Sequence, residues 1–383
     1  MKSIKSIKSV KSVEFVEEEV DQLNHTELVD KNFVLFAEGC FGLFTSKIAA
    51  SLIRYRGDRC VAVIDSRKAG QTVQDVLGYG GAIPIVGRVE HALNLRPEVM
   101  VIGKGLHSAE LPSGWKPHIL AAARNGLHLI NSIHFRLTDD PDIARAVHEK
   151  GITVWETKDA PAVPLNRARV LDLDTWVIHT CGSDSNIGKK TAALQIWNEA
   201  NRGGIRTGFA ATGQSGMLIS GHGIAVDGVP GDFMAGAVER VVMEAAAGNE
   251  WVVVEGQGSL NHIGFSSVAL AILHGALPHA LVFCHRLGAE RTKVWETPII
   301  PIPELIRMNE ELSVFERPAK VAAVSVNSIG YTEQDYRREA EKLEADTGLP
   351  VVDPIREGGA AQLVEILRAH QHEAAVRQLV RRR

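Results

Sequence analysis

Residues 181–191 constrain the fold of this chain more than any other stretch. They read Cys-Gly-Ser-Asp-Ser-Asn-Ile-Gly-Lys-Lys-Thr, follow the apolar run at 176–178, and lead into a helix-forming segment that starts at Thr191. A strand, a glycine-rich loop, a Gly-Lys pair and a helix form a phosphate cradle. The loop amides and the helix N-terminus point at an anion, and the lysine adds a positive charge. The sequence therefore predicts a phosphate-binding loop (P-loop) in an α/β domain.

The loop departs from the usual pattern in ways that bear on its chemistry. Five residues rather than four separate Gly182 from Gly188, and Lys190 stands where a hydroxyl residue usually holds magnesium. Asp184 would repel a phosphate unless a cation or a substrate amine lies between them. No metal site is predicted, although Thr191 and Glu255 are the candidates for Mg²⁺. The expected phosphate ligands are Gly182, Ser183, Asp184, Ser185, Asn186, Gly188, Lys189, Lys190 and Thr191.

A second constellation is Trp-Val-Val-Val-Glu-Gly-Gln-Gly-Ser-Leu at 251–260. An apolar strand that ends in a carboxylate matches the metal-side strand of P-loop proteins, where the acid lies at the carboxyl edge of the sheet. Glu255 could bind magnesium, act as a base, or cap a turn. The flanking glycines let the backbone approach a ligand closely.

Further polar residues follow other predicted strands of this half. Residues 211–216 read Ala-Thr-Gly-Gln-Ser-Gly and are expected beside the P-loop at the same sheet edge. Asp232 precedes a helix and could equally be its N-cap. His285 and Arg286 directly follow a strand at 280–283. Asn327 and Ser328 end a strand at 321–326, where such folds often contact a base.

The N-terminal half alternates strands and helices in the same way. Short apolar strands are expected at 33–37, 60–64, 81–85, 99–102, 126–130 and 151–155, with a helix from 47 to 55. Such a pattern favours a parallel sheet covered on both faces. Gly39, Gly42 and Asp65 are reminiscent of a dinucleotide-binding start, but Ala37 replaces the first glycine. A domain that shapes a shared cleft is preferred over nicotinamide binding.

The whole chain is thus predicted to be α/β, with two doubly wound, mainly parallel sheets. The expected division is a low-complexity extension at 1–30, a Rossmann-like domain at 31–160 and a P-loop NTPase-like domain at 161–383, joined by a proline-rich linker near 158–165. The extension repeats Lys-Ser and is expected to stay outside the core, as a mobile or oligomer arm.

Composition excludes several classes of partner. The net charge of −4 gives no reason to expect nucleic acid, and no apolar run approaches the roughly 18 residues that span a bilayer. The four scattered cysteines (Cys40, Cys60, Cys181 and Cys284) favour buried thiols in a reducing compartment over disulfides or zinc. We expect a cytoplasmic protein that acts on a small-molecule substrate and forms a homo-oligomer.

These motifs carry a resemblance to known families. The P-loop and Val-Val-Glu-Gly-Gln-Gly resemble dethiobiotin synthetase and its amidoligase relatives. A closer match extends over nearly the whole chain from residue 32: Val-Ile-Gly-Lys-Gly at 101–105, the motifs at 211–216 and 254–260, and Cys-His-Arg at 284–286 resemble a two-domain family long catalogued without a function. Its halves are Rossmann-like and P-loop domains, and some members are implicated as D-glutamate N-acetyltransferases.

The resemblance implies an N-acetyltransferase that moves an acetyl group from acetyl-CoA to an acidic amino acid, D-glutamate above all. The P-loop would hold the phosphates of the carrier. An amine must lose a proton before it attacks a thioester. Glu255 is the expected base, with His285 or Asp232 as fallback. The expected substrate-binding residues are Thr212, Gln214, Ser215, Gln257 and Arg286.

Two other classes remain open at this point. An ATP- and Mg-dependent ligase or NTPase of the dethiobiotin synthetase type would hydrolyse nucleotide, and Lys190 in the metal position argues against it. A non-catalytic nucleotide-binding regulator would bind tightly without turnover. Lys104 and His107, on the loop after a predicted strand, could reach the shared cleft from the N-terminal side.

Overall fold

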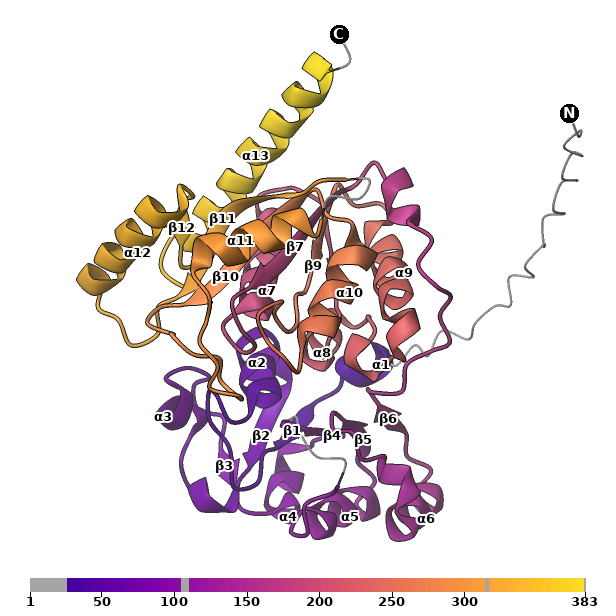
Figure 1. Cartoon of the computed structure of the whole chain (residues 1–383). Coiled ribbons are helices and arrows are strands. Elements are labelled where there is room, and N and C mark those ends of the chain that lie inside the picture. Colours follow the sequence, from indigo (N-terminus) through magenta and orange to yellow (C-terminus); the bar gives the residue numbers. More distant parts are fainter. Residues whose placement is uncertain (1–25, 105–109, 314–316, 382–383) are drawn as a thin grey trace, which may run out of the picture.

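Apolar and β-branched runs of the chain form two six-stranded parallel sheets, each flanked by helices. In the computed structural model, which describes residues 26–104, 110–313 and 317–381, the two sheets belong to two domains packed against each other (Figure 1). Every pair of neighbouring strands is parallel. The predicted α/β class with two doubly wound domains is confirmed.

The N-terminal sheet has the order β3-β2-β1-β4-β5-β6, which is the Rossmann order. Its strands are β1 (Phe33–Phe36), β2 (Cys60–Ile64), β3 (Ile85–Val86), β4 (Val99–Ile102), β5 (His128–Asn131) and β6 (Val154–Glu156). Its helices are α1 (Thr26–Val29), α2 (Lys47–Arg56), α3 (Val73–Leu77), α4 (Val89–Ala92), α5 (Lys116–Arg124) and α6 (Pro141–Lys150).

The C-terminal sheet has the order β12-β11-β10-β7-β9-β8. Its strands are β7 (Trp176–Gly182), β8 (Thr207–Ala210), β9 (Trp251–Val254), β10 (Ala280–Arg286), β11 (Lys320–Asn327) and β12 (Val351–Val352). Its helices are α7 (Lys189–Arg202), α8 (Gln214–Ser220), α9 (Met234–Ala246), α10 (Ser266–Ala276), α11 (Ile302–Glu311), α12 (Glu333–Thr347) and α13 (Gly359–Arg381). The strand β7, which leads into the P-loop, lies between β10 and β9.

Several local predictions need correction. The strand expected at 81–85 is wrong: Gly80 and Gly81 have positive φ angles and form a turn, and the strand begins at Ile85. The two-residue strand β12 was missed because it is too short to show a pattern. The segment 1–30 was expected to lie outside the core, but its residues Leu28 and Val29 are buried in the core. Both side chains are apolar, and Arg56 fixes the backbone at this point by donating to the Val29 carbonyl oxygen at 2.7 Å.

Helix α2 lies at the boundary between the domains (Figure 1). Ile48, Ala49, Leu52 and Ile53 form its buried stripe, as expected of an amphipathic helix. This stripe belongs to the same buried apolar cluster as Met217, Leu218 and Ile219 of α8 in the other domain. Polar bonds cross the boundary as well: Gln195 donates to the Tyr55 hydroxyl at 3.2 Å, and Arg56 donates to the Ile219 carbonyl at 3.4 Å.

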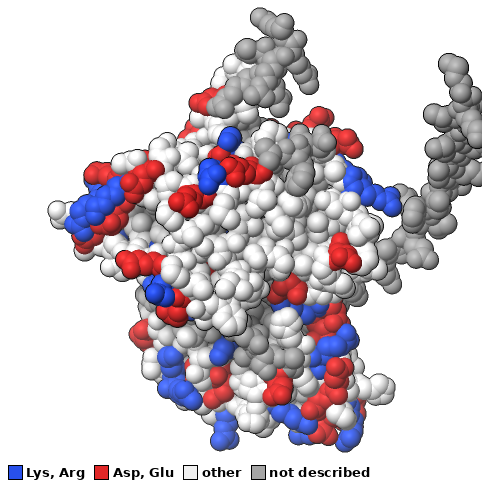
Figure 2. Space-filling view, viewed as in Figure 1, with Lys and Arg blue, Asp and Glu red and all other residues white. Residues whose placement is uncertain are grey.

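The surface carries no dominant charge on the face seen in Figure 2. Acidic and basic side chains are mixed over the N-terminal domain and over α12, whereas the middle of the C-terminal domain has few of either. This mixture agrees with the small net charge of −4. Within the described ranges, no helix combines the length and hydrophobicity needed to cross a membrane.

Candidate active site

The P-loop joins β7 to α7 and has the backbone geometry of an anion cradle. A Cβ atom at Gly182 would lie 2.4 Å from the carbonyl oxygen of Cys284, so only glycine fits between β7 and β10. Gly188 has a φ of 126° and forms the N-cap of α7 without a side-chain cap. The first amides of α7 therefore keep no side-chain partner, which leaves the positive end of the helix available to an anion.

The two lysines of the loop take different directions. Lys189 is buried and folds back to donate to the carbonyl oxygen of Asp184 at 2.5 Å. Lys190 reaches across the domain boundary and donates to the hydroxyl of Ser51 on α2 at 2.6 Å. Burial lowers the pKa of each lysine to about 8, while the charge of Glu255 partly opposes that shift at Lys190.

Glu255 follows β9, the strand that pairs directly with β7. Its Oε2 atom accepts hydrogen bonds from the amides of Thr212 at 3.2 Å and Gly213 at 3.1 Å. Burial raises the pKa of Glu255 to about 7, although Lys190 and the two amides lower it. The 211–216 segment was expected beside the P-loop; it follows β8, which β9 separates from β7, and it contacts Glu255 instead. The carboxyl group is poised to exchange a proton at neutral pH.

Gly216 makes room for this carboxylate. A Cβ atom at that position would lie 2.2 Å from Oε2 of Glu255, closer than atoms can approach. Gly216 lies within α8, where alanine would otherwise be the better helix former. The glycine is therefore explained by the position of Glu255.

A magnesium ion fits this edge of the sheet poorly. The ammonium of Lys190 lies close enough to influence the ionisation of Glu255, and a cation there repels a divalent ion. Among residues 26–104, 110–313 and 317–381, no group of three or more His, Cys, Asp or Glu side chains could hold a metal ion. Thr191 was the other candidate magnesium ligand, and among the described residues it forms no hydrogen bond with Glu255.

The fallback bases have different surroundings. His285 is buried at the end of β10, and its Nδ1 atom lies 2.9 Å from the Ser183 hydroxyl oxygen. Burial lowers the pKa of His285 to about 4, so the ring is neutral at pH 7. Asp232 is exposed in the short 3-10 helix Gly231–Phe233, and α9 has no side-chain cap. Within the described chain, no hydrogen bond or ion pair joins Asp232 to the loop.

The expected substrate-binding amides are engaged within the protein. Gln214 donates to Asp227 at 3.3 Å, and Gln257 donates to the carbonyl oxygen of Thr212. The Thr212 hydroxyl donates to the Glu255 carbonyl oxygen at 2.8 Å. Ser215 is buried in the first turn of α8. These side chains fix the shape of the segment around Glu255, and a role for either glutamine at a substrate requires its present bond to break.

The N-terminal domain contributes residues to the site that the sequence analysis did not name. The Phe44 ring, on the loop after β1, lies 5.0 Å from the guanidinium carbon of Arg286 and 5.4 Å from the ammonium of Lys293. Lys47, at the start of α2, is influenced by the charges of Lys190, Lys293 and Lys189. These contacts bring the two domains together beside the P-loop, whereas the shared cleft stays a prediction. His107 lies outside the described residues.

Asp184 is a buried residue of the P-loop itself. Its Oδ2 atom accepts from the Lys293 amide at 2.8 Å, and its Oδ1 atom accepts from the Ser185 amide at 2.6 Å. The Nε2 atom of the buried His262 lies 4.0 Å from Oδ1 and has no hydrogen-bond partner in the described protein. The amide nitrogen of Asn186, a loop residue with a φ of 57°, is also buried without a partner among the described residues. Buried donors without a partner are rare in proteins, and an acceptor group of a ligand would satisfy these two.

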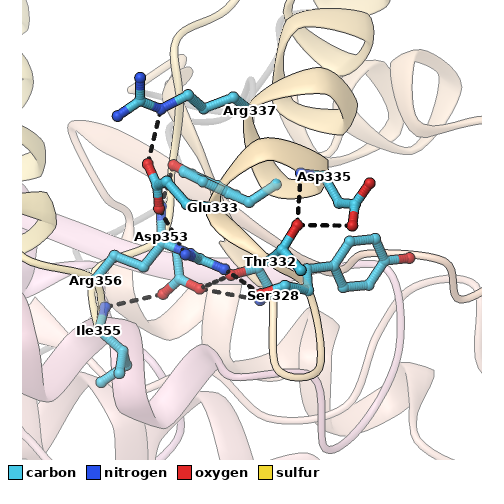
Figure 3. Close-up of polar contacts among 10 residues, drawn as sticks. Ser328, Thr332, Glu333, Asp335, Arg337, Asp353, Ile355 and Arg356 are labelled. Atoms are coloured by element: carbon cyan, nitrogen blue, oxygen red, sulfur yellow. Dashed lines mark hydrogen bonds and ion pairs between the residues drawn. The ribbon is translucent and has the colours of Figure 1, made fainter.

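Polar side chains that follow β11 form a network of hydrogen bonds and ion pairs within the protein (Figure 3). Ser328 donates through its hydroxyl to Asp353 at 2.6 Å and accepts from Arg356 at 2.8 Å. Arg356 also pairs with Glu333 at 2.7 Å. These bonds occupy the buried Ser328 side chain, which was considered for contact with a base. Asn327 lies nearer the loop, since its Cβ atom is 3.7 Å from the position of a Cβ on Gly188.

Sequence analysis did not identify Phe44, Lys47, Ser51 and Lys293 as site residues. The glycine spacing at Gly39 and Gly42 marked the loop after β1, but it gave no sign that this loop meets β10 of the other domain. A lysine at the start of an amphipathic helix is ordinary in any sequence. The role of these residues depends on how the two domains pack.

The fold and the site define a two-domain α/β protein in which a Rossmann-like domain packs against a P-loop domain and cations gather where they meet. Residues 164–364 match the family described as "Domain of unknown function (DUF1611_C) P-loop domain", and residues 66–160 match "Domain of unknown function (DUF1611_N) Rossmann-like domain". The chain belongs to the DUF1611 family. The resemblance seen in the sequence motifs is confirmed.

Relatives with functional names and a solved structure cover nearly the whole chain. A "D-glutamate N-acetyltransferase" of Tritonibacter scottomollicae is 30% identical over 89% of this chain and 100% of its own length. One of the same name from Pseudoalteromonas sp. is 29% identical over 85% of this chain and 96% of its own length. A DUF1611 protein from Anabaena variabilis has 32% identity and a TM-score of 0.84, covering 88% of this chain and 99% of that one.

Proposed function

We propose that this protein is an N-acetyltransferase that transfers an acetyl group from acetyl-CoA to the amino group of an acidic amino acid, with D-glutamate as the preferred acceptor. The observation that carries the proposal is the 30% identity, over 89% of the chain, to a protein named for that reaction. The site is chemically compatible with it, since a cationic cradle adjoins a carboxyl group with a pKa of about 7.

The donor would be held by the P-loop. Acetyl-CoA supplies an acetyl group activated as a thioester. The uncapped amides at the start of α7 and the charge of Lys189 fit its phosphates. The loop need not split a phosphate anhydride in this role, so the absence of a hydroxyl at position 190 is no disadvantage.

Glu255 would act on the acceptor. As a carboxylate it accepts a proton from the substrate ammonium, and a pKa near 7 suits that task at neutral pH. The amides of Thr212 and Gly213 fix its orientation. Arg286 would pair with a carboxylate of the acceptor, because among the described residues its guanidinium has no acidic partner and lies over the Phe44 ring.

One experiment separates this proposal from the alternatives. The protein is incubated with D-glutamate and either acetyl-CoA or ATP with Mg²⁺, and free thiol and phosphate are followed. Thiol release that requires D-glutamate supports the proposal, and the same reaction with L-glutamate tests stereochemistry. Phosphate release without thiol release would instead support a ligase or NTPase. Binding without either product would support a regulator.

A further inference from the structure

Lys47 is a cation of the N-terminal domain that lies one helical turn before Ser51, whose hydroxyl accepts from Lys190 of the P-loop at 2.6 Å, so it is on the face of α2 that meets the loop. It is the first residue of α2, and its N-cap Ser46 makes no side-chain cap. Lys47 keeps part of its surface exposed to solvent although its ammonium is largely desolvated, so an anion at the domain boundary can reach it. In the part of the chain that the structure describes, its ammonium has no hydrogen bond or ion pair.

The surroundings of Lys47 are strongly positive. Desolvation comes first among the causes that lower its pKa to about 8, followed by repulsion from Lys190, Lys293 and Lys189, while Asp184 acts in the opposite sense. The carboxylate of Asp184 is held by two backbone amides, and its charge and that of Glu255, which acts on Lys190, stand against four lysines. The protein thus gathers like charges with too little acid among its described residues to balance them.

Lys293 makes the second side of this cluster. It belongs to the segment after β10, and its ammonium lies 5.4 Å from the Phe44 ring centroid. It has no acidic partner among the described side chains, and its backbone amide fixes its position by donating to Asp184 at 2.8 Å. Lys47 and Lys293 therefore come from different domains and flank the same loop.

The clustered charges favour phosphate over other anions. A phosphate group carries up to about two negative charges and several acceptor oxygens, and so it can serve several lysines at once. The uncapped start of α7, with Lys189, can hold one phosphate. Lys47 and Lys293 lie beside that cradle and remain available for a second one.

We propose that Lys47 and Lys293 form a second phosphate subsite, adjoining the P-loop across the domain boundary, for a ligand that carries at least two phosphate groups. This inference deepens the proposed function and rests on its assignment of the P-loop to a phosphate-bearing donor. The negative charge of the ligand would neutralise the lysines that the two domains bring together. The acceptor's carboxylate is not the occupant of this subsite.

The test compares the binding of pyrophosphate with that of inorganic phosphate by calorimetry. Wild-type protein is expected to bind pyrophosphate more tightly than phosphate. Lys47→Met and Lys293→Met should each weaken pyrophosphate binding by about tenfold or more and change phosphate binding by less than about threefold, as expected for loss of one charge-assisted contact. Lys150→Met, at the exposed end of α6, is the matched control and should change neither.

Two outcomes would overturn the subsite. One is an unchanged preference for pyrophosphate in both variants, and the other is a weakening of D-glutamate binding in place of pyrophosphate binding. The thermal unfolding midpoint of each variant establishes whether it is folded. If Lys47→Met does not fold, Lys293→Met alone carries the test. Because no acetyl transfer is measured, failure of the proposed reaction leaves this test intact. The reaction could likewise hold while the subsite fails.

Discussion

At the scale of single residues, Glu255 shows how a buried carboxyl group is held close to half-ionisation at neutral pH. Burial raises its pKa, and Lys190 with the amides of Thr212 and Gly213 limits the rise to about 7. An ordinary glutamate, ionised far below neutrality, would be a weaker base. The balance depends on neighbours from α7 and from the chain after β8.

This balance predicts the pH dependence of acetyl transfer. As pH rises through about 7, Glu255 loses its proton and kcat/KM should increase. Above about 8, Lys189 and Lys190 lose their charges and donor binding should weaken, so the profile is bell-shaped. Glu255→Gln should lower kcat on the order of 10²–10⁴-fold and remove the rising limb. Full activity in this variant, with binding intact, would contradict the assignment.

Gly216→Ala should reduce activity without unfolding the protein. The new Cβ would lie 2.2 Å from Oε2 of Glu255, so the carboxylate must move and lose its amide contacts. We expect a decrease in kcat of about tenfold or more, measured beside the far-UV circular dichroism. Gly57→Ala is the control, because a Cβ added there would meet no described neighbour within 4 Å and its φ is −60°. Equal activity of both variants would show that the clash is relieved without consequence.

At the scale of elements, the β7–loop–α7 unit has the shape of a nucleotide-hydrolysing loop with a cation in place of its metal ligand. Lys190 occupies the position where a magnesium ligand usually stands. It donates instead to Ser51 of α2 and so connects the two domains. The loop geometry and the phosphate role are separable from the metal role. The loop can therefore belong to a transferase that leaves phosphates intact.

Removal of divalent metals should leave acetyl transfer unchanged. The ammonium of Lys190 supplies positive charge near Glu255, and a magnesium ion there would be repelled. Activity with excess EDTA should stay within about twofold of that with added Mg²⁺, with both measured by thiol release. A loss of activity that added Mg²⁺ reverses would favour the ATP- and Mg-dependent ligase or NTPase instead.

Elements were predictable from sequence where their signal is local. The Gly-Lys spacing and the flanking apolar run identify the P-loop, and a strand ending in Glu255 identifies its neighbour, because parallel strands place their carboxyl ends at one edge. The contact of Phe44 with Arg286 has no such signal, since it joins two domains. The internal bonds of Gln214 and Gln257 were equally hidden, because donors of this type serve the protein's own oxygens as readily as substrates.

At the scale of the whole molecule, the two domains share one buried apolar cluster. It runs from the face of the N-terminal sheet under α2 to the face of the C-terminal sheet under α7 and α13. Ser51, Tyr55 and Arg56 add polar bonds from α2 to the other domain. Separation of the domains would expose this apolar surface to water.

Thermal unfolding of the whole chain should therefore be a single cooperative transition. Loss of either domain would remove the packing of α2 against α8 and destabilise the other. Differential scanning calorimetry should give one peak, with equal van't Hoff and calorimetric enthalpies. Two resolved peaks would show that the domains unfold independently in spite of the shared core. Whether the chain also forms a homo-oligomer stays a prediction.

The buried cysteines have a consequence for the proposed reaction, whose donor is a thioester. Cys181 and Cys284 lie on β7 and β10, in the strands beneath the P-loop, and both are buried. Burial raises the pKa of each thiol, to about 12 for Cys284, so neither supplies a thiolate at neutral pH. Since only the thiolate is the competent nucleophile, an acyl group bound above them would be insulated from transthioesterification onto the protein itself.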